Sequence, residues 1–110
     1  MSQGVLLSRE LGLLRVGAAV PLLRVADVDF NVENIIEAMK KARNEGVQVL
    51  TFPEMAITGY TLGDLVQHQA LLSKAKEGLR HILDESTGNS MVIIIGMPLD
   101  IEQRIFNCAV

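Results

Sequence analysis

The fold of this chain is decided by residues 47–60, which read VQVLTFPEMAITGY. Val47 to Phe52 is a short, near-continuous apolar run, which predicts a strand covered on both faces. Only Pro53 separates this run from the charged Glu54. Open α/β sheets carry their functional sites just beyond the carboxyl ends of their strands. Glu54 is therefore the first candidate functional residue.

Two further apolar runs have the same form. They span residues 16–21 and 91–98, and, like residues 47–53, each ends at one of the 3 prolines of the chain. Proline cannot donate to a sheet ladder, so it suits the point at which a strand leaves its sheet. The three runs predict three buried strands, each ending at its proline.

Two helices are expected between these strands, because apolar residues recur there at three- and four-residue spacing. The first stripe consists of Val32, Ile35, Ile36, Met39 and Ala42, and the second of Leu72, Ala75, Leu79, Ile82 and Leu83. Asp29 or Asn31 can cap the start of the first helix, and Gly46 can close its end in a left-handed turn.

The order of these elements predicts an α/β fold with a parallel βαβαβ arrangement and right-handed crossovers. Residues 105–110 predict a last strand, which returns antiparallel beside the third because residues 97–104 are few enough for a turn. Residues 1–13, rich in leucine, are expected to form an N-terminal arm or a short helix. The chain stops inside the apolar last strand, whereas domains usually end in polar residues. We therefore expect residues 14–110 to be the N-terminal part of a larger domain, incomplete at its C-terminus.

Composition narrows the possible functions. A chain of 110 residues with 49% apolar and 21% charged residues suits one soluble globular domain. The net charge of −3 provides no basic surface for nucleic acid. The longest apolar run, residues 91–97, is too short to cross a bilayer. With no visible secretory signal and a single cysteine, we expect a cytoplasmic protein without a disulfide framework.

The residues around Glu54 favour a catalytic role for its carboxylate over that of a surface charge that only ends a strand. Pro53 restricts the backbone before it, and Gly59 permits a close approach or a positive φ. Tyr60 offers an aromatic face with a polar tip. Glu54 could therefore act as a general base, and Tyr60 could form a wall of the substrate pocket beside it.

Residues 52–60, FPEMAITGY, resemble the glutamate motif of the nitrilase superfamily, the carbon–nitrogen hydrolases. The resemblance extends over about residues 14–110. Within it, the segments RVGAAVP, TLGDL, IGMP and FNCA, which begin at residues 15, 61, 95 and 106, are similar to glutamine-dependent NAD synthetases. The resemblance implies that the chain forms part of a nitrilase-like α-β-β-α sandwich.

The same resemblance implies a Glu–Lys–Cys triad that hydrolyses the side-chain amide of glutamine. Glu54 matches the glutamate and would be the general base, and Tyr60 matches a position of the glutamine pocket. A base in this role works best in an apolar, poorly hydrated setting. We expect Glu54 to be held rigidly in such a setting.

The lysine and the nucleophilic cysteine of the family lie downstream of the last strand, beyond Val110. Cys108 is the only cysteine here, but it lies in an apolar strand that precedes the family's lysine. We interpret it as a buried thiol that packs as a hydrophobe. The 110-residue chain should therefore have no glutaminase activity by itself.

The resemblance also implies a parent enzyme in which ammonia passes to a C-terminal synthetase domain. That domain would use ATP and magnesium to amidate deamido-NAD to NAD, and the parent would form a homo-oligomer. No cofactor is expected to bind this chain itself. Two alternatives stay open: a stand-alone carbon–nitrogen hydrolase, such as an amidase or carbamoylase, and a non-catalytic βαβ module that supports assembly.

No metal site is expected. His68 and His81 are thirteen residues apart, with no third ligand at a suitable spacing. The four lysines of the two helical segments, Lys40, Lys41, Lys74 and Lys76, are interpreted as solvated charges.

Overall fold

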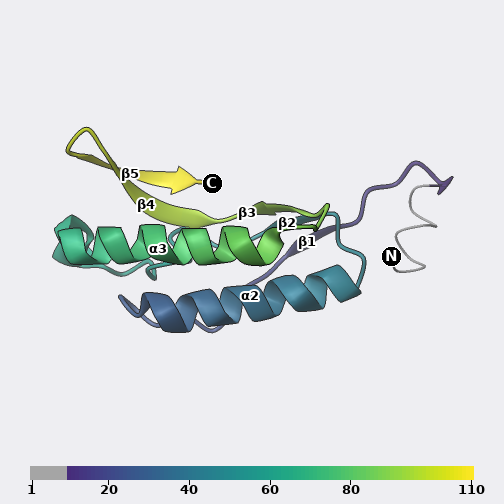
Figure 1. Ribbon diagram of the computed structural model, residues 1–110, viewed down its shortest axis with the longest axis horizontal. Helices are drawn as coiled ribbons and strands as arrows, with labels where there is room; N and C mark the ends of the chain where they lie inside the picture. Colours follow the sequence, from purple (N-terminus) through teal and green to yellow (C-terminus); the bar gives the residue numbers. More distant parts are fainter. Residues whose placement is uncertain (1–9) are drawn as a thin grey trace.

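A computed structural model describes residues 10–110, which form a parallel sheet, two α-helices and an antiparallel hairpin (Figure 1). In chain order the elements are β1 (Val16–Ala18), α2 (Val28–Asn44), β2 (Val49–Thr51), the 3-10 helix η1 (Gly63–Gln67), α3 (Gln69–Ser86), β3 (Val92–Ile94), β4 (Gly96–Ile101) and β5 (Arg104–Ala109). The expected arm or helix over residues 1–13 lies mostly outside the described residues, and residues 11–15 form a turn followed by irregular chain.

The three-stranded sheet has the order β1-β2-β3, and both strand pairs are parallel. Val49 of the central strand β2 lies opposite Val16 on one side and Val92 on the other. Each parallel connection contains one α-helix, so the predicted βαβαβ arrangement is confirmed. The strands are shorter than the apolar runs that predicted them: β1 ends at Ala18, β2 at Thr51 and β3 at Ile94.

The third apolar run contains two strands instead of one. β3 ends at Ile94, and β4 begins at Gly96 and pairs with β5 in an antiparallel hairpin. The last strand is antiparallel, as predicted, but its partner is β4. The expectation that Pro98 ends a strand is wrong, because Pro98 lies inside β4 opposite Asn107. A two-stranded hairpin has free edges, where a residue without an N–H group is tolerated.

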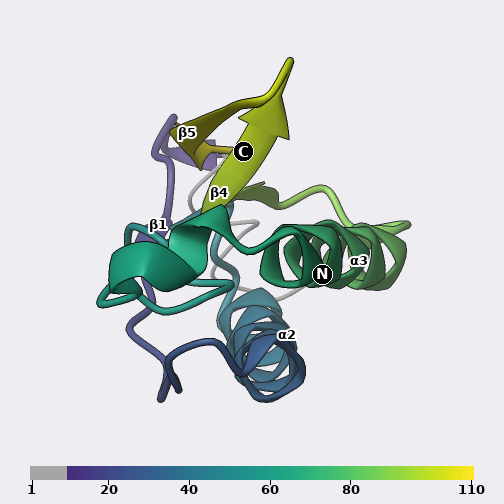
Figure 2. The same cartoon turned by 90° about the vertical axis from the view of Figure 1, so that its left-hand side faces the viewer.

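Both helices cover one face of the parallel sheet (Figure 2). The predicted stripe of α2 is buried throughout, and it packs with Leu50 of β2 in the core. In α3, Leu72, Ala75 and Ile82 are buried, but Leu83 is 58% exposed, so its assignment to the stripe was wrong. A Cβ at Gly78 of α3 would lie 2.8 Å from Val32 of α2. Gly78 therefore allows the two helices to approach closely.

The opposite face of the sheet is apolar and exposed within the described residues. Side chains alternate between the two faces of a strand. Gly17, Leu50 and Ile93 face the helices, whereas Val16 and Val92 face the other way and are 65% and 55% exposed. This open face is formed by Val16, Ala18, Val49, Thr51, Val92 and Ile94. In the expected α-β-β-α sandwich, the second sheet would cover it.

The start of α2 differs from the expectation. Asp27 caps the helix and accepts a hydrogen bond of 3.2 Å from the backbone N–H of Phe30, so neither Asp29 nor Asn31 is the cap. Gly46 closes the helix with a φ of 78°, as predicted. At the surface, Lys74 of α3 reaches Asp29 of α2 at 3.2 Å, and this hydrogen bond raises the pKa of Lys74. None of the helices in residues 10–110 combines the length and the hydrophobicity needed to span a bilayer.

Candidate active site

Glu54 lies just beyond the carboxyl end of the central strand β2, at the start of a turn over residues 54–58. The backbone N–H groups of Thr58 and Gly59 both donate to the carbonyl of Met55, at 3.2 and 2.8 Å. Met55 itself adopts a left-handed conformation with a φ of 57°. Such a conformation is unfavourable by about 1 kcal/mol for a residue other than glycine, so the surrounding contacts must hold it in place.

Gly96 is one of these contacts. It follows β3, the strand next to β2, and its carbonyl accepts a hydrogen bond of 3.3 Å from Ile57 N–H. A Cβ built on Gly96 would lie 2.7 Å from the carbonyl oxygen of Pro53 and 2.8 Å from Glu54 Cα. The two chain segments therefore touch backbone to backbone, and this contact fixes the position of Glu54.

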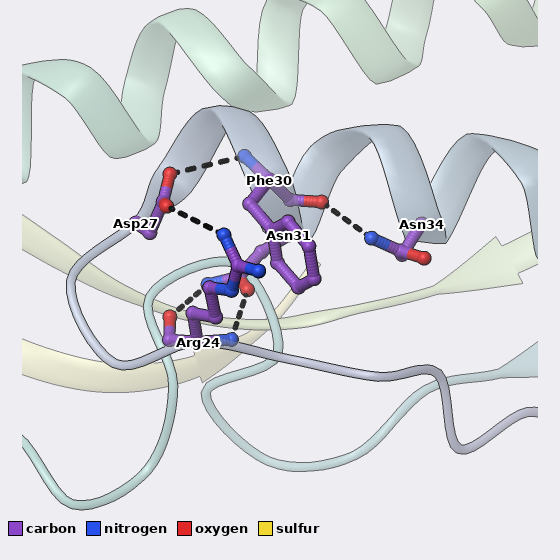
Figure 3. Close-up of polar contacts among 5 residues, drawn as sticks. All are labelled: Arg24, Asp27, Phe30, Asn31 and Asn34. Carbon is purple, nitrogen blue, oxygen red and sulfur yellow. Dashed lines mark hydrogen bonds and ion pairs between the residues drawn. The ribbon is translucent and has the colours of Figure 1, made fainter.

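Asn31 fixes the other side of the same turn, and Figure 3 shows its hydrogen bonds with Arg24. Its side chain is fully buried, and its Nδ2 donates to the carbonyls of Arg24 and Ile57 at 2.8 and 3.0 Å. Its Oδ1 accepts a 2.6 Å hydrogen bond from Arg24 N–H. The side-chain amide of Asn31 therefore links the segment before α2 to the turn that follows Glu54. Its N–H and C=O groups pair with backbone groups, as a neighbouring strand would in a sheet.

Gly59 allows these two segments to approach each other. It has a φ of 85°, and a Cβ at this position would lie 3.0 Å from Val25 Cα. The backbone N–H of Ala26 donates a hydrogen bond of 2.7 Å to the backbone carbonyl of Thr58. Both properties expected of Gly59, a close approach and a positive φ, are confirmed.

The carboxylate of Glu54 accepts a hydrogen bond from the side-chain amide of Asn107 in β5. Glu54 is nevertheless exposed within the described residues. The apolar strand before it supplies rigidity but does not enclose the carboxylate, so these residues do not create the expected poorly hydrated setting.

Tyr60 follows this turn after Gly59 and is 67% exposed. Neither residue lines the apolar cavity of about 230 Å³ between α3 and the sheet, which is bounded by Leu79, Ile82 and Met91 among others. The structure thus places Glu54 and Tyr60 on one rigid turn, and it does not bring them together in that cavity.

The other candidates lie elsewhere. Cys108 is half-buried, and it faces away from Glu54 because it is adjacent to Asn107 in a strand. His81 is exposed beside Glu85. In the part of the chain that the structure describes, no three His, Cys, Asp or Glu side chains are grouped closely enough to hold a metal ion. Lys40, Lys41, Lys74 and Lys76 are all exposed, as predicted.

Three residues of the site were missed in the sequence. Asn31 was considered as a helix cap, and Gly96 and Asn107 were quoted without a role. Two of them had a visible signal, because Gly96 interrupts a long apolar run and Asn107 is the one amide in the strand segment IFNCA.

The described residues thus form a parallel sheet, and the turn that carries Glu54 lies just beyond the carboxyl end of its central strand. Residues 15–110 match the carbon–nitrogen hydrolase family, and the chain belongs to it. It is homologous to the N-terminal region of glutamine-dependent NAD synthetases. The glutamine-dependent NAD(+) synthetase of Mycobacterium tuberculosis is 27% identical over 99 residues, which are 90% of this chain and 15% of the relative.

Solved structures show the same relationship. A glutamine-dependent NAD(+) synthetase from Cytophaga hutchinsonii superposes with a TM-score of 0.81 and is 31% identical, over 87% of this chain and 16% of that one. An amidase from Nesterenkonia sp. superposes over 74% of this chain and 31% of its own, with a TM-score of 0.57 and 23% identity, which shows the shared fold alone. The chain thus spans about one sixth of the length of the synthetases that it resembles.

Proposed function

We propose that this chain supplies the general base of a glutaminase, in a protein that uses the released ammonia to amidate deamido-NAD to NAD. The placement of Glu54 carries this proposal. The backbone that carries Glu54 is held by contacts from both sides, just past the central strand of a carbon–nitrogen hydrolase domain. The similarity to glutamine-dependent NAD synthetases supports the choice of glutamine as substrate.

In this reaction Glu54 takes the proton from a cysteine thiol, and the thiolate attacks the side-chain amide carbon of glutamine. A lysine stabilises the oxyanion of the tetrahedral intermediate. Protonated Glu54 gives its proton to the leaving nitrogen, so the intermediate collapses to a thioester and ammonia, and Glu54 is again a free carboxylate. Glu54 then takes a proton from the water that hydrolyses the thioester to glutamate. Tyr60 forms part of the pocket for the glutamine substrate.

The lysine and the nucleophilic cysteine come from polypeptide outside these 110 residues, because Cys108 faces away from Glu54 and the exposed helix lysines lie on α2 and α3. The open face of the sheet is the surface on which that polypeptide would pack. The chain alone is therefore inactive. ATP and magnesium belong to a separate synthetase domain, and the whole protein is a cytoplasmic homo-oligomer.

The amidase fold of the Nesterenkonia protein supports a second candidate, a stand-alone carbon–nitrogen hydrolase. A non-catalytic βαβ module is the third. The match to the Cytophaga hutchinsonii synthetase favours the first proposal, because its TM-score of 0.81 and its identity of 31% both exceed the 0.57 and 23% of the amidase.

The test uses the full-length protein with glutamine, ATP, magnesium and deamido-NAD, and it measures NAD and glutamate. The proposal expects both products in comparable amounts, and NAD formation when ammonium replaces glutamine. Hydrolysis of simple amides without NAD formation would identify a stand-alone hydrolase, and no turnover of either kind would favour the assembly module. The 110-residue chain should release no more ammonia from glutamine than its Cys108→Ala variant.

A further inference from the structure

Asn107 is the one amide in β5 between Ile105 and Ala109. Asparagine is depleted in β-strands because its side chain competes for backbone hydrogen bonds and packs poorly on a pleated surface. Strand formation therefore does not explain its presence. The only hydrogen bond that we find for its side chain within residues 10–110 is the one that it donates to Glu54.

The register of the hairpin aims this amide at Glu54. Ala109 lies opposite Gly96, and Asn107 lies opposite Pro98. Pro98 is therefore two residues from Gly96 in β4, and Asn107 is two residues from Ala109 in β5. Residues that are opposite in an antiparallel pair, or two apart in one strand, share a face. The Cβ direction of Gly96 meets the backbone of Glu54, so Asn107 is on the face that looks toward the glutamate.

The ends of the hairpin hold this register. Ile95 and Val110 exchange two backbone hydrogen bonds of 2.9 Å beside Gly96. The hairpin therefore meets the Glu54 turn through Gly96 and places Asn107 at a fixed distance from the carboxylate.

An amide has a specific chemical advantage here. A carboxylate only accepts hydrogen bonds, so the amide must present its N–H to Glu54 Oε1. A lysine or arginine would form an ion pair with the base, and an aspartate would repel it. A neutral donor fixes the orientation of the carboxylate and leaves Oε2 without a hydrogen-bond partner in residues 10–110.

We propose that Asn107 is a positioning residue for Glu54: its amide holds Oε1, so that Oε2 is directed at the proton of the nucleophile. This inference rests on the proposed function. The hydrogen bond is exposed in the described residues, so it contributes little to folding. Its effect should therefore be seen in turnover, because a displacement of about 1 Å in a reacting group can lower a rate by about 10²-fold.

The test compares full-length Asn107→Leu and Asn107→Asp with the parent protein and with Glu54→Gln. Asn107→Leu removes the donor and keeps the number and branching of the side-chain heavy atoms, and Asn107→Asp keeps the shape but replaces the donor by a second carboxylate. We expect both to lower kcat for glutamine hydrolysis about 10- to 100-fold. KM for glutamine should stay within about twofold, and synthesis from added ammonium should be unchanged, because the interaction acts on the base and not on substrate binding.

Asn44→Leu is the matched control, because it makes the same substitution at an exposed asparagine at the end of α2. A kcat that is unchanged in both Asn107 variants, while Glu54→Gln abolishes glutamine hydrolysis, would overturn the role of Asn107 and leave the proposed function standing. A raised KM with normal kcat would also overturn it. If Asn107→Leu loses thermal stability, Asn107→Asp decides the question. If Glu54→Gln hydrolyses glutamine normally, the proposed function itself is wrong.

Discussion

Gly96 and Glu54 are in direct backbone contact, although 42 positions separate them in the sequence. A Cβ on Gly96 would come within 2.8 Å of Glu54 Cα and within 2.7 Å of the preceding carbonyl oxygen. These are backbone atoms, which cannot move aside as the end of a flexible side chain can. The carboxyl ends of β2 and β3 thus meet at a point where only glycine fits.

We therefore expect Gly96→Ala to displace the Glu54 turn. The substitution should lower the free energy of unfolding by about 1–3 kcal/mol, as overpacking does in a well-packed interior. It should also reduce glutamine hydrolysis more than ammonium-dependent synthesis. Urea denaturation and steady-state kinetics of the full-length protein measure the two effects.

Gly17→Ala in β1 is the control for this change, since a Cβ there would meet its neighbours at an ordinary 3.4–3.5 Å. Equal stability and equal activity of the two alanine variants would show that the Gly96 contact does not determine the position of Glu54.

Asn31 should be essential to the folded turn. Asn31→Leu would leave the backbone carbonyls of Arg24 and Ile57 and the N–H of Arg24 without their side-chain partner. Buried polar groups without partners destabilise by about 1–3 kcal/mol each, so we expect a total loss of about 3 kcal/mol in the urea-derived stability of this domain.

Asn34→Leu provides the comparison on the same helix. Asn34 makes one hydrogen bond, to Phe30 of its own helix, and it is only half-buried. Its replacement should change the stability by less than about 1 kcal/mol. Similar losses in the two variants would argue against the bridging role of Asn31.

Tyr60 should affect the binding of glutamine more than the chemical step. It is 67% exposed on the turn that carries Glu54, so its replacement leaves the core intact. Tyr60→Ala is expected to raise KM for glutamine about 10-fold or more, with a smaller change in kcat, because a pocket wall contributes similarly to ground state and transition state. A lower kcat at constant KM would instead place Tyr60 in the chemistry.

The isolated 110-residue chain should self-associate. Its open sheet face exposes Val16 and Val92, and an apolar face of this kind is covered in stable proteins. Sedimentation at micromolar concentrations should show dimers or larger species, and Val92→Lys should shift the distribution toward monomer. A stable monomer at all concentrations would contradict this expectation.

Much of the fold was predictable because each element has a local pattern. The stripe from Val32 to Ala42 predicted the buried face of α2, and the apolar runs predicted three parallel strands. The division of residues 91–98 at Ile95 was missed although Gly96 interrupts the run, because the residues on both sides of Gly96 are apolar and no polar residue separates the two strands. The same holds for Leu83, whose spacing fits the stripe although its position lies at the edge of the contact with the sheet.

The site was less predictable than the fold. Glu54 stands out because a charge closely follows an apolar strand. The residues that position it come from α2, from the start of β4 and from β5, and such long-range contacts leave no local periodicity. Asn31 shows the difficulty, since an asparagine near a helix start reads as a cap until the structure shows its carbonyl partners.

The most direct measurement is glutamine-dependent and ammonium-dependent NAD synthesis by full-length Glu54→Gln, beside the exposed-surface control Glu37→Gln of α2. Loss of a general base lowers a rate by about 10²–10⁴-fold. We expect a loss of this size with glutamine in Glu54→Gln, normal synthesis with ammonium, and no change in Glu37→Gln. Undiminished glutamine-dependent synthesis in Glu54→Gln would contradict the assignment of Glu54 as the base.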